Sequence, residues 1–361
     1  MLKLPLLPHP FPYGIHPSFE PDNPDRVRFE EATMAFRDRF HLYGDEQQRE
    51  RLGRAEIARF AAMMYRSGRD ELLQVASDLL LWVFAFDDEY CDEGPLSRDP
   101  AGLIQAAARI QRSIESPEHV VNTDRYALAL HDIRCRLDRY AVPVQVGRFV
   151  EAMRTYLMAE MWKAVTPKPS LNDYLVMRLY GGGGWVFVPV LHHIVAGIDL
   201  AQEDYEDRRV RALAEIVLSL AQWDLEPYSY VKERARAVDG KEHNLIAVLC
   251  RERGCGVEQA LSEYMTLRAR ALSLFRRLRI QVETEASPAV RSYIQGIVEV
   301  YSGNVFWGRA NHRYRSVSGL GDECTAYEGG ELVDAFPDAH FEPLGLPSFD
   351  WWWHYDPARR S

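Results

Sequence analysis

Residues 79–93 read LLLWVFAFDDEYCDE, so that five carboxylates follow directly on eight strongly apolar residues. The first two acids, Asp87 and Asp88, adjoin the apolar run without a polar spacer, and at least one of them should lie partly out of water. Such carboxylates need a counter-charge, and oxygen ligands suit hard divalent cations such as Mg2+. The stretch therefore predicts a metal site at the end of a buried helix, with a solvated acidic turn as the alternative.

Helical periodicity dominates the chain from residue 26 onward, while strand-like alternation bounded by turns is nearly absent. Start signals such as Ser287-Pro288 support this pattern. We expect helices over 26–42, 54–68, 70–91, 100–115, 122–140, 143–165, 171–197, 203–236, 242–252, 256–285 and 287–316. The sequence thus predicts an all-α fold, a single large helical bundle packed around a central core or cavity.

The two ends of the chain differ from the helical body. Residues 1–25 are rich in proline and aromatic residues and should wrap over a surface in extended form. From residue 317 two glycines and short polar residues favour a turn, and the tail through Trp351-Trp352-Trp353 is too aromatic to be freely solvated. We therefore expect a helical domain over 1–316 and an irregular tail over 317–361, which packs back as a surface cover rather than as a lid.

Composition limits the classes of function. The net charge of −10 argues against binding to nucleic acid or anionic membranes in general. Five cysteines without a CxxC pair suggest neither a disulfide framework nor a zinc site. Early prolines argue against a secretory segment, and no apolar run approaches the roughly 20 residues that cross a bilayer. We expect a cytoplasmic protein with no membrane span and no nucleic-acid partner.

Three further patterns could complete a site for an anion. Ser229 and Glu233 share a helix face, with Lys232 beside them. Arg178 stands just before four glycines, 181–184, which should break a helix and expose its backbone groups. Arg313 and Tyr314 are adjacent hydrogen-bond donors that suit phosphate oxygens. Each pattern alone is weak, since surface helices and loops show the same residues.

In this order and at these separations, the four patterns resemble the motifs of the bacterial class I terpene synthases. Asp87 and Asp88 match the aspartate-rich motif of that family, although its usual third acid falls at Cys91. Arg178 matches the diphosphate-sensing arginine, and Gly182 matches the helix-break position that helps trigger ionisation. An aspartate often stands between these two in the family, whereas this chain has Gly181 there.

The later motifs of the family are matched in part. Ser229, Lys232 and Glu233 match its second metal motif, and Arg313-Tyr314 match its carboxy-terminal pair. The resemblance extends from residue 15 to residue 314, which leaves out little besides the tail.

One departure lies at Leu225, where the family has Asn or Asp four residues before the serine. Glu226 lies within about 60° of Ser229 and Glu233 on an undistorted helix. Asp224 lies about 140° from Ser229 and would need a bulge to reach the same ion. We therefore expect Glu226 to be the replacement ligand and keep Asp224 as the alternative.

The resemblance implies a helical bundle around a central apolar cavity and a Mg2+-dependent reaction on a linear isoprenyl diphosphate. Three Mg2+ ions would be held by the two acidic motifs, and the family favours farnesyl over geranylgeranyl diphosphate. The ions would stabilise the leaving diphosphate together with Arg178, Lys232, Arg313 and Tyr314. Aromatic faces would then stabilise the carbocation during cyclisation. The candidates for this role are Phe60, Phe84, Trp185 and Trp307.

Three rival interpretations remain open. A chain-elongating prenyltransferase would be expected to carry two similar aspartate-rich motifs. A non-catalytic isoprenoid-binding protein would be impaired at Leu225. A di-iron or haem protein would use His192 and His193, which project about 100° apart on a helix and make a poor shared site. A homodimer is an open expectation for the assembly.

Overall fold

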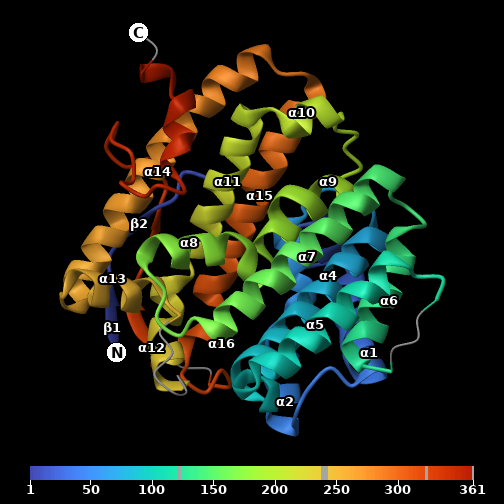
Figure 1. The fold of residues 1–361 in the computed structure, drawn as a ribbon. Helices are drawn as coiled ribbons and strands as arrows, with labels where there is room; N and C mark the ends of the chain where they lie inside the picture. Colours follow the sequence, from blue (N-terminus) through green and yellow to red (C-terminus); the bar gives the residue numbers. More distant parts are fainter. Residues whose placement is uncertain (120–122, 237–242, 322–323, 360–361) are drawn as a thin grey trace. The chain divides into compact units, whose positions relative to one another are not determined.

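The structure is a computed structural model that describes residues 1–119, 123–236, 243–321 and 324–359 (Figure 1). Its residue contacts divide the chain into two compact units. The N-terminal unit comprises Gly14–Thr166 and Tyr180–Gly197. The C-terminal unit comprises Met1–Tyr13, Pro167–Leu179 and Ile198–Ser361. We describe each unit by itself.

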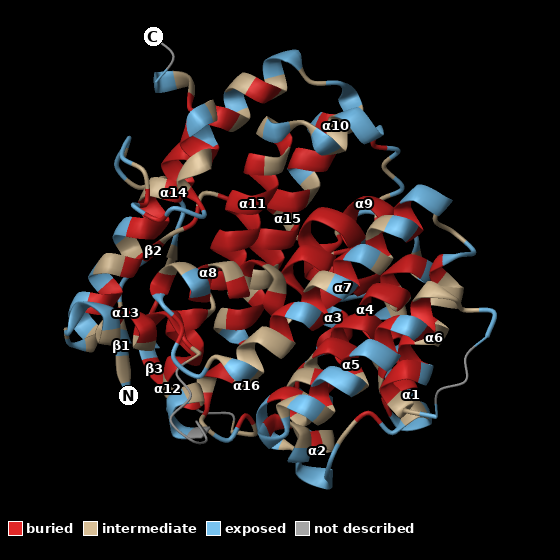
Figure 2. Cartoon of the chain, in the orientation of Figure 1, coloured by how far each residue is buried: buried red, intermediate tan, exposed pale blue. Residues whose placement is uncertain are grey.

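Helix α4, Asp70–Phe86, is the central element of the N-terminal unit and packs against α1, α3 and α6. Its residues Leu79–Val83 are at most 2% exposed, and Figure 2 colours most of the helix as buried. A helix that is apolar on all sides must lie in the interior. The other elements of this unit are α1 Asp25–Phe40, α2 Glu46–Arg54, α3 Ile57–Met64, α5 Pro100–Glu115, α6 Arg125–Leu137, α7 Pro143–Val165, α9 His192–Val195, π-helical turns at Asp87–Glu93 and Val186–Leu191, and 3-10 turns at Pro17–Phe19, Pro95–Arg98 and Gly181–Gly183.

Helix α11, Arg208–Trp223, forms the core of the C-terminal unit, where it packs on α14 and α15. Every residue from Ala212 to Trp223 is buried. The other helices are α8 Leu171–Tyr180, whose last residue belongs to the N-terminal unit, α10 Gln202–Glu206, α12 Glu226–Arg236, α13 Leu245–Arg253, α14 Val257–Glu285, α15 Pro288–Ala310 and α16 His312–Arg315.

The two chain ends pair with each other inside the C-terminal unit. Strand β1, Leu2–Leu4, runs parallel to β3, Tyr327–Gly329, and β2, Leu7–Pro8, runs parallel to β4, Leu332–Val333. The last 3-10 turns, Asp350–Tyr355 and Pro357–Arg359, are held by two polar contacts, one from the first turn and one from Asp356 between the turns. Trp352 Nε1 donates to Glu215 on α11 at 2.9 Å, and Arg277 on α14 forms an ion pair with Asp356 at 2.6 Å. The aromatic tail therefore packs on α11 and α14.

The predicted all-α class is confirmed, but several predicted helices are divided. The helix expected over 171–197 breaks at Gly181–Gly183, because Gly182 and Gly183 adopt positive φ angles of 61° and 72°. The helix expected over 203–236 is three helices. Asp207 caps the start of α11 through its side chain, and Pro227 at the second position of α12 lacks the N–H that a continuing helix would need. Helix α2 was not expected, and the boundary of the helical domain at residue 316 stays a prediction.

Among the described residues, no single helix is long and apolar enough to cross a bilayer. One bent pair, Leu171–Gly183 with Val186–Val195, meets the length and composition criteria only when both helices are taken together.

Candidate metal centre

The aspartate-rich stretch follows α4 as a π-helical turn at Asp87–Glu93. Such turns shift the hydrogen bonds to residues five apart and are frequent at functional sites. Oxygen atoms of Asp87, Asp88 and Asp92 all lie within 4.8 Å of one another. On an α-helix, Cys91 would be the residue on the same face as Asp87. The wider π-helical turn also brings Asp92, five residues after Asp87, to that face.

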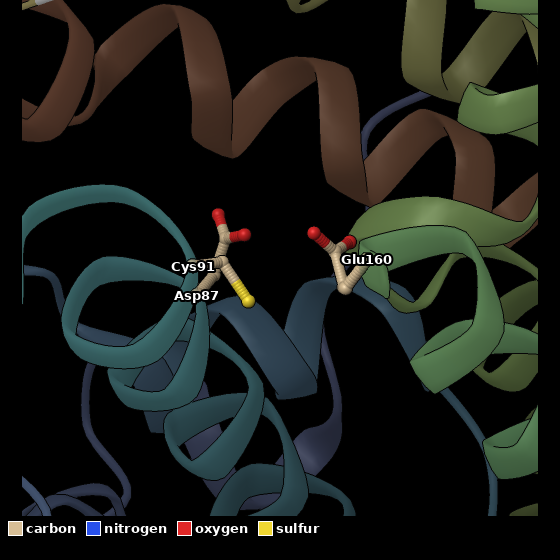
Figure 3. Close-up of side chains that lie close together, drawn as sticks. All are labelled: Asp87, Cys91 and Glu160. Carbon is tan, nitrogen blue, oxygen red and sulfur yellow. The ribbon is translucent and has the colours of Figure 1, made fainter. Parts of the chain in front are cut away.

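A second group of potential ligands joins this turn to α7. Atoms of Asp87, Cys91 and Glu160 also lie within 4.8 Å of one another. Figure 3 shows the carboxylate of Glu160, which comes from α7, facing the side chains of Asp87 and Cys91. Glu160 is only 3% exposed. The sequence did not predict this residue, because one acid near the end of a long helix carries no motif of its own.

Lys163 places a cation inside this acidic cluster. Its Nζ lies 3.0 Å from Asp87 Oδ1, 2.9 Å from Asp92 Oδ1 and 3.4 Å from Glu160 Oε2. Burial alone would lower the pKa of Lys163, but the three carboxylates hold it well above its ordinary value. Carboxylate oxygens are the ligands that hard divalent ions prefer, and here three acids surround one positive charge. The ammonium thus occupies a position that a divalent ion could take. The residues present therefore fit a metal.

The pKa of Asp92 reflects the same crowding of negative charge. Partial removal from water and the neighbouring Asp87 carboxylate raise the pKa of Asp92 to about 7, although Lys163 opposes the shift. A divalent ion would favour the charged form of this acid.

The other two acids of the stretch have partners of their own. Glu89 is bound by the guanidinium of Arg125 and accepts a hydrogen bond of 2.7 Å from the Tyr126 hydroxyl. Glu93 forms an ion pair of 2.6 Å with Arg51. The structure thus groups Asp87, Asp88 and Asp92 as potential metal ligands and pairs the two glutamates with arginines. From the sequence alone, the glutamates were candidates as good as Asp92.

The helix break lies against the acid of α7. The amide of Gly182 donates to Glu160 Oε1 at 3.0 Å. A Cβ atom on Gly181 would lie 3.2 Å from the same oxygen, so that Glu160 limits the space for a side chain there. A Cβ atom on Gly183 would lie 2.6 Å from the ring of Phe187. Glycine is therefore required at 183 by both its φ angle and its neighbour.

In the C-terminal unit, Asp224 is fully engaged by a buried network. Its two oxygens accept from Arg268 at 2.8 and 3.0 Å, from the Tyr264 hydroxyl at 2.7 Å and from the Tyr301 hydroxyl at 2.6 Å. Asp224 is 0% exposed and Arg268 is 1% exposed. These partners tie the end of α11 to α14 and α15, and the choice of Glu226 over Asp224 as a metal ligand stays a prediction.

Glu226 begins α12 and is held by residues from two other elements. Both of its oxygens lie 2.9 Å from the Tyr174 hydroxyl of α8, and one accepts from the amide of Leu245 at 2.9 Å. Arg178 Nε lies 2.8 Å from the same carboxylate, while Arg178 Nη2 donates to Gln222. Burial and the nearby Glu233 raise the pKa of Glu226 to about 7, and Arg178 opposes them.

Asn244 connects the remaining members of the second motif. Its Nδ2 donates to Glu233 Oε2 at 2.8 Å and lies 3.3 Å from Ser229 Oγ. Its Oδ1 accepts from the amide of Ile246 at 2.9 Å and so caps α13. Because the cap fixes which end of the amide faces Glu233, Asn244 holds both Glu233 and Ser229 in place. Its cap position was the only signal in the sequence.

Leu225 packs where the family motif would place a ligand. A Cβ atom on Gly308 of α15 would lie 2.2 Å from Leu225 Cδ2, so the side chain lies directly on the bare backbone of that glycine. Further along α12, Lys232 Nζ lies 5.1 Å from the ring centre of Tyr314. The structure therefore brings Lys232 and Tyr314 together, with Arg313 adjacent to Tyr314 on α16.

The four candidate aromatic residues fall in both units. In the N-terminal unit the rings of Phe60 and Phe84 stack 6.2 Å apart, and Trp185 lies 5.9 Å from Tyr180. In the C-terminal unit Trp307 packs edge-on against Tyr314 at 5.8 Å. All of them except Phe84 are buried. Their role toward a carbocation stays a prediction.

Comparison with known proteins gives consistent matches. Residues 78–272 match the family model described as terpene synthase family 2, C-terminal metal binding. The chain is 35% identical over 355 residues to (+)-(1(10)E,4E,6S,7R)-germacradien-6-ol synthase of Streptomyces pratensis, a match that covers 97% of this chain and 96% of that protein. It is 30% identical to the (+)-T-muurolol synthase of Streptomyces clavuligerus, described as cyclising (2E,6E)-farnesyl diphosphate, over 81% of this chain and 70% of that protein.

A solved structure is similar over nearly the whole length. The crystal structure of the SVS_A2 protein, obtained by ancestral sequence reconstruction, matches with a TM-score of 0.81 and 30% identity. The match covers 98% of this chain and 99% of that chain.

Proposed function

Because this chain belongs to the terpene synthase family and is a class I terpene synthase, we propose that it ionises farnesyl diphosphate with bound Mg2+, cyclises the resulting carbocation and releases diphosphate. The observation that carries the proposal is the cluster of Asp87, Asp88 and Asp92, of which Asp87 and Asp92 contact the ammonium of Lys163. The name of the Streptomyces clavuligerus relative supports a fifteen-carbon substrate. Geranylgeranyl diphosphate is the alternative substrate.

We assign metal binding to the acids of each unit. Asp87, Asp88 and Asp92 would bind ions in the N-terminal unit, and Glu226, Ser229 and Glu233 in the C-terminal unit, for three Mg2+ ions in all. When bound, divalent ions supply Lewis acidity that neutralises the diphosphate oxygens and stabilises the leaving group. Arg178 now pairs with the carboxylate of Glu226. When Arg178 binds the diphosphate instead, Glu226 would become available as a metal ligand.

The chain's own donors would act on the diphosphate at the same time. Arg178 offers a planar guanidinium that matches phosphate oxygens, and Lys232 adds a point charge. Arg313 and the hydroxyl of Tyr314 add further donors beside Lys232. Preorganised donors of this kind stabilise charge as it develops, because they need little reorganisation during the reaction. Aromatic faces such as those of Phe84 and Trp185 would then stabilise the carbocation without offering a nucleophile.

Product analysis tests this function. Purified protein is incubated with Mg2+ and either farnesyl or geranylgeranyl diphosphate, and diphosphate release is measured beside gas chromatography with mass spectrometry. We expect a fifteen-carbon product and diphosphate from farnesyl diphosphate, both abolished by EDTA. Asp87→Asn should lose turnover by about 100-fold or more while the fold is retained. The exposed Asp22→Asn variant is the matched control. Absence of product and diphosphate from both substrates would refute the proposal.

A further inference from the structure

A chain of polar contacts runs from the aspartate-rich turn to the helix break inside the N-terminal unit. Asp87 and Asp92 both contact the ammonium of Lys163, at 3.0 and 2.9 Å. The same ammonium lies 3.4 Å from Glu160 Oε2, and Glu160 Oε1 accepts the amide of Gly182 at 3.0 Å. Two residues one helical turn apart on α7 thus connect the acids to the backbone of the break.

Lys163 is suited to move when a metal binds. An ammonium and a divalent ion repel each other, so they will not share the oxygens of Asp87 and Asp92. The lysine side chain has a flexible four-carbon stem, and it is 20% exposed on the side-chain surface, which leaves it room to turn. Glu160 lies three residues earlier on the same helix and already faces the ammonium, so it is the anion to which Lys163 can turn.

The ammonium of Lys163 faces Glu160 Oε2 while the amide of Gly182 bonds to Oε1, so a closer approach of the ammonium draws the carboxylate toward Lys163 and away from the amide. An ammonium carries a full charge and a backbone amide only a dipole, so the carboxylate reorients toward the cation when the two compete, and its bond to the amide weakens. Gly182 has a φ angle of 61°, which glycine adopts and leaves at little cost. The hydrogen bond from Glu160 is therefore a local contact that favours this backbone conformation, and its weakening should be felt at the break.

We propose that Lys163 and Glu160 are positioning residues that link cation occupancy of the aspartate-rich turn to the backbone of the helix break. Without metal, Lys163 neutralises Asp87 and Asp92 while Glu160 holds the amide of Gly182. With metal, Lys163 turns to Glu160 and the amide of Gly182 is released. This inference rests on the proposed metal assignment, because it requires that Asp87 binds the ion.

Metal affinity tests the first half of the link. Mn2+ binding is measured by electron paramagnetic resonance on the full chain with inorganic diphosphate. Lys163→Met should bind Mn2+ on the order of tenfold more tightly, because the competing ammonium is gone, whereas Lys163→Arg should stay near the unsubstituted protein. The exposed Lys168→Met variant is the control. Equal or weaker binding by a folded Lys163→Met variant would overturn the inference, and the melting temperature of each variant without metal establishes folding.

Hydrogen exchange tests the second half. Deuterium uptake is followed in peptides that cover residues 180–187, with diphosphate alone and with diphosphate plus Mn2+. In the unsubstituted protein, Mn2+ should increase uptake at Gly182. In Glu160→Gln the increase should vanish, because glutamine still accepts the amide but does not attract the ammonium. Glu151→Gln, an exposed substitution on the same helix, should keep the increase.

The outcomes separate this inference from the proposed function. Mn2+ binding could depend on Asp87 and yet leave deuterium uptake at Gly182 unchanged. In that case the link is refuted and the metal assignment stands. If the increase persists in Glu160→Gln, Glu160 has only a structural role and the link is also refuted. If Asp87→Asn does not weaken Mn2+ binding, both the metal assignment and the link fail.

Discussion

The acids of the two units are neutralised in different ways. In the N-terminal unit, Asp87 and Asp92 share the single ammonium of Lys163 on a flexible side chain. In the C-terminal unit, Asp224 is bound by Arg268 and two tyrosines. Among the described residues, every cluster of three His, Cys, Asp or Glu ligands lies in the N-terminal unit. Carboxylates near a motif thus divide into those that face one lysine side chain and those that are held by a buried arginine and two tyrosines.

Leu225 shows how the second region tolerates its departure from the family motif. The leucine fills the space over Gly308, so an apolar contact between α11–α12 and α15 replaces a polar side chain. Glu226 next to it binds Arg178, and Asn244 from the next helix orients Ser229 and Glu233. Leu225 thus cannot serve as a ligand, while Glu226, Ser229 and Glu233 are each held by an ion pair or a hydrogen bond.

The largest effect should come from breaking the network of Asp224. Asp224→Asn leaves Arg268 buried without its full counter-charge, and it should lower the free energy of unfolding by about 3–5 kcal/mol. Urea denaturation measures this, with the exposed Asp334→Asn as control. If Asp224→Asn keeps its stability but loses Mg2+ affinity, Asp224 is a metal ligand. The acids of the two units would then not differ in the way described above.

Arg178→Met should reduce kcat/KM by about 100-fold, because a donor to the diphosphate is lost. Steady-state diphosphate release measures the change, and the exposed Arg109→Met serves as control. Arg178→Lys should recover only part of the rate, since an ammonium lacks the planar pair of donors. Full activity in Arg178→Met would mean that the pair with Glu226 is purely structural.

A buried histidine gives the N-terminal unit a pH dependence of its own. Burial, together with His192 and Arg148, lowers the pKa of His193 to about 3. The folded state therefore keeps this imidazole neutral, while the unfolded chain binds a proton below its ordinary pKa of about 6.5, so stability falls as the pH drops below that value. From pH 8 to pH 5 the loss should be about 2 kcal/mol from this group. Urea denaturation should show a shallower pH dependence for His193→Gln, and an unchanged slope would contradict the assignment.

The smallest effect is expected at Asn244. Asn244→Ala removes the cap of α13 and should cost about 1 kcal/mol of unfolding free energy. It should also raise the Mg2+ concentration needed for half-maximal turnover, because Glu233 and Ser229 lose their common donor. Asn23→Ala removes a comparable local bond away from the acids and should leave the Mg2+ requirement unchanged. Equal Mg2+ requirements in both variants would reduce Asn244 to a helix cap.

The sequence predicted the helical class and the order of the motifs because both depend on residues that are close together in the chain. Helical periodicity and acids that follow an apolar run require no knowledge of distant contacts. Lys163, Glu160 and Asn244 escaped prediction because each contacts a group that belongs to another element: Asp87, the amide of Gly182 and Glu233. The role of Leu225 depends in the same way on Gly308, 83 residues further along the chain. Pro227 stands in the first turn of a new helix, α12, whose start no helical pattern in 203–236 marked.

The most direct test of the account compares one acid from each unit in the same assay. Diphosphate release from farnesyl diphosphate is measured at saturating Mg2+ for Asp87→Asn and Glu233→Gln, with Glu151→Gln as control. We expect both site variants to remain folded and to lose about 100-fold or more in turnover, while the control stays normal. Near-normal release by either folded site variant would contradict the assignment of that acid as a metal ligand in its unit.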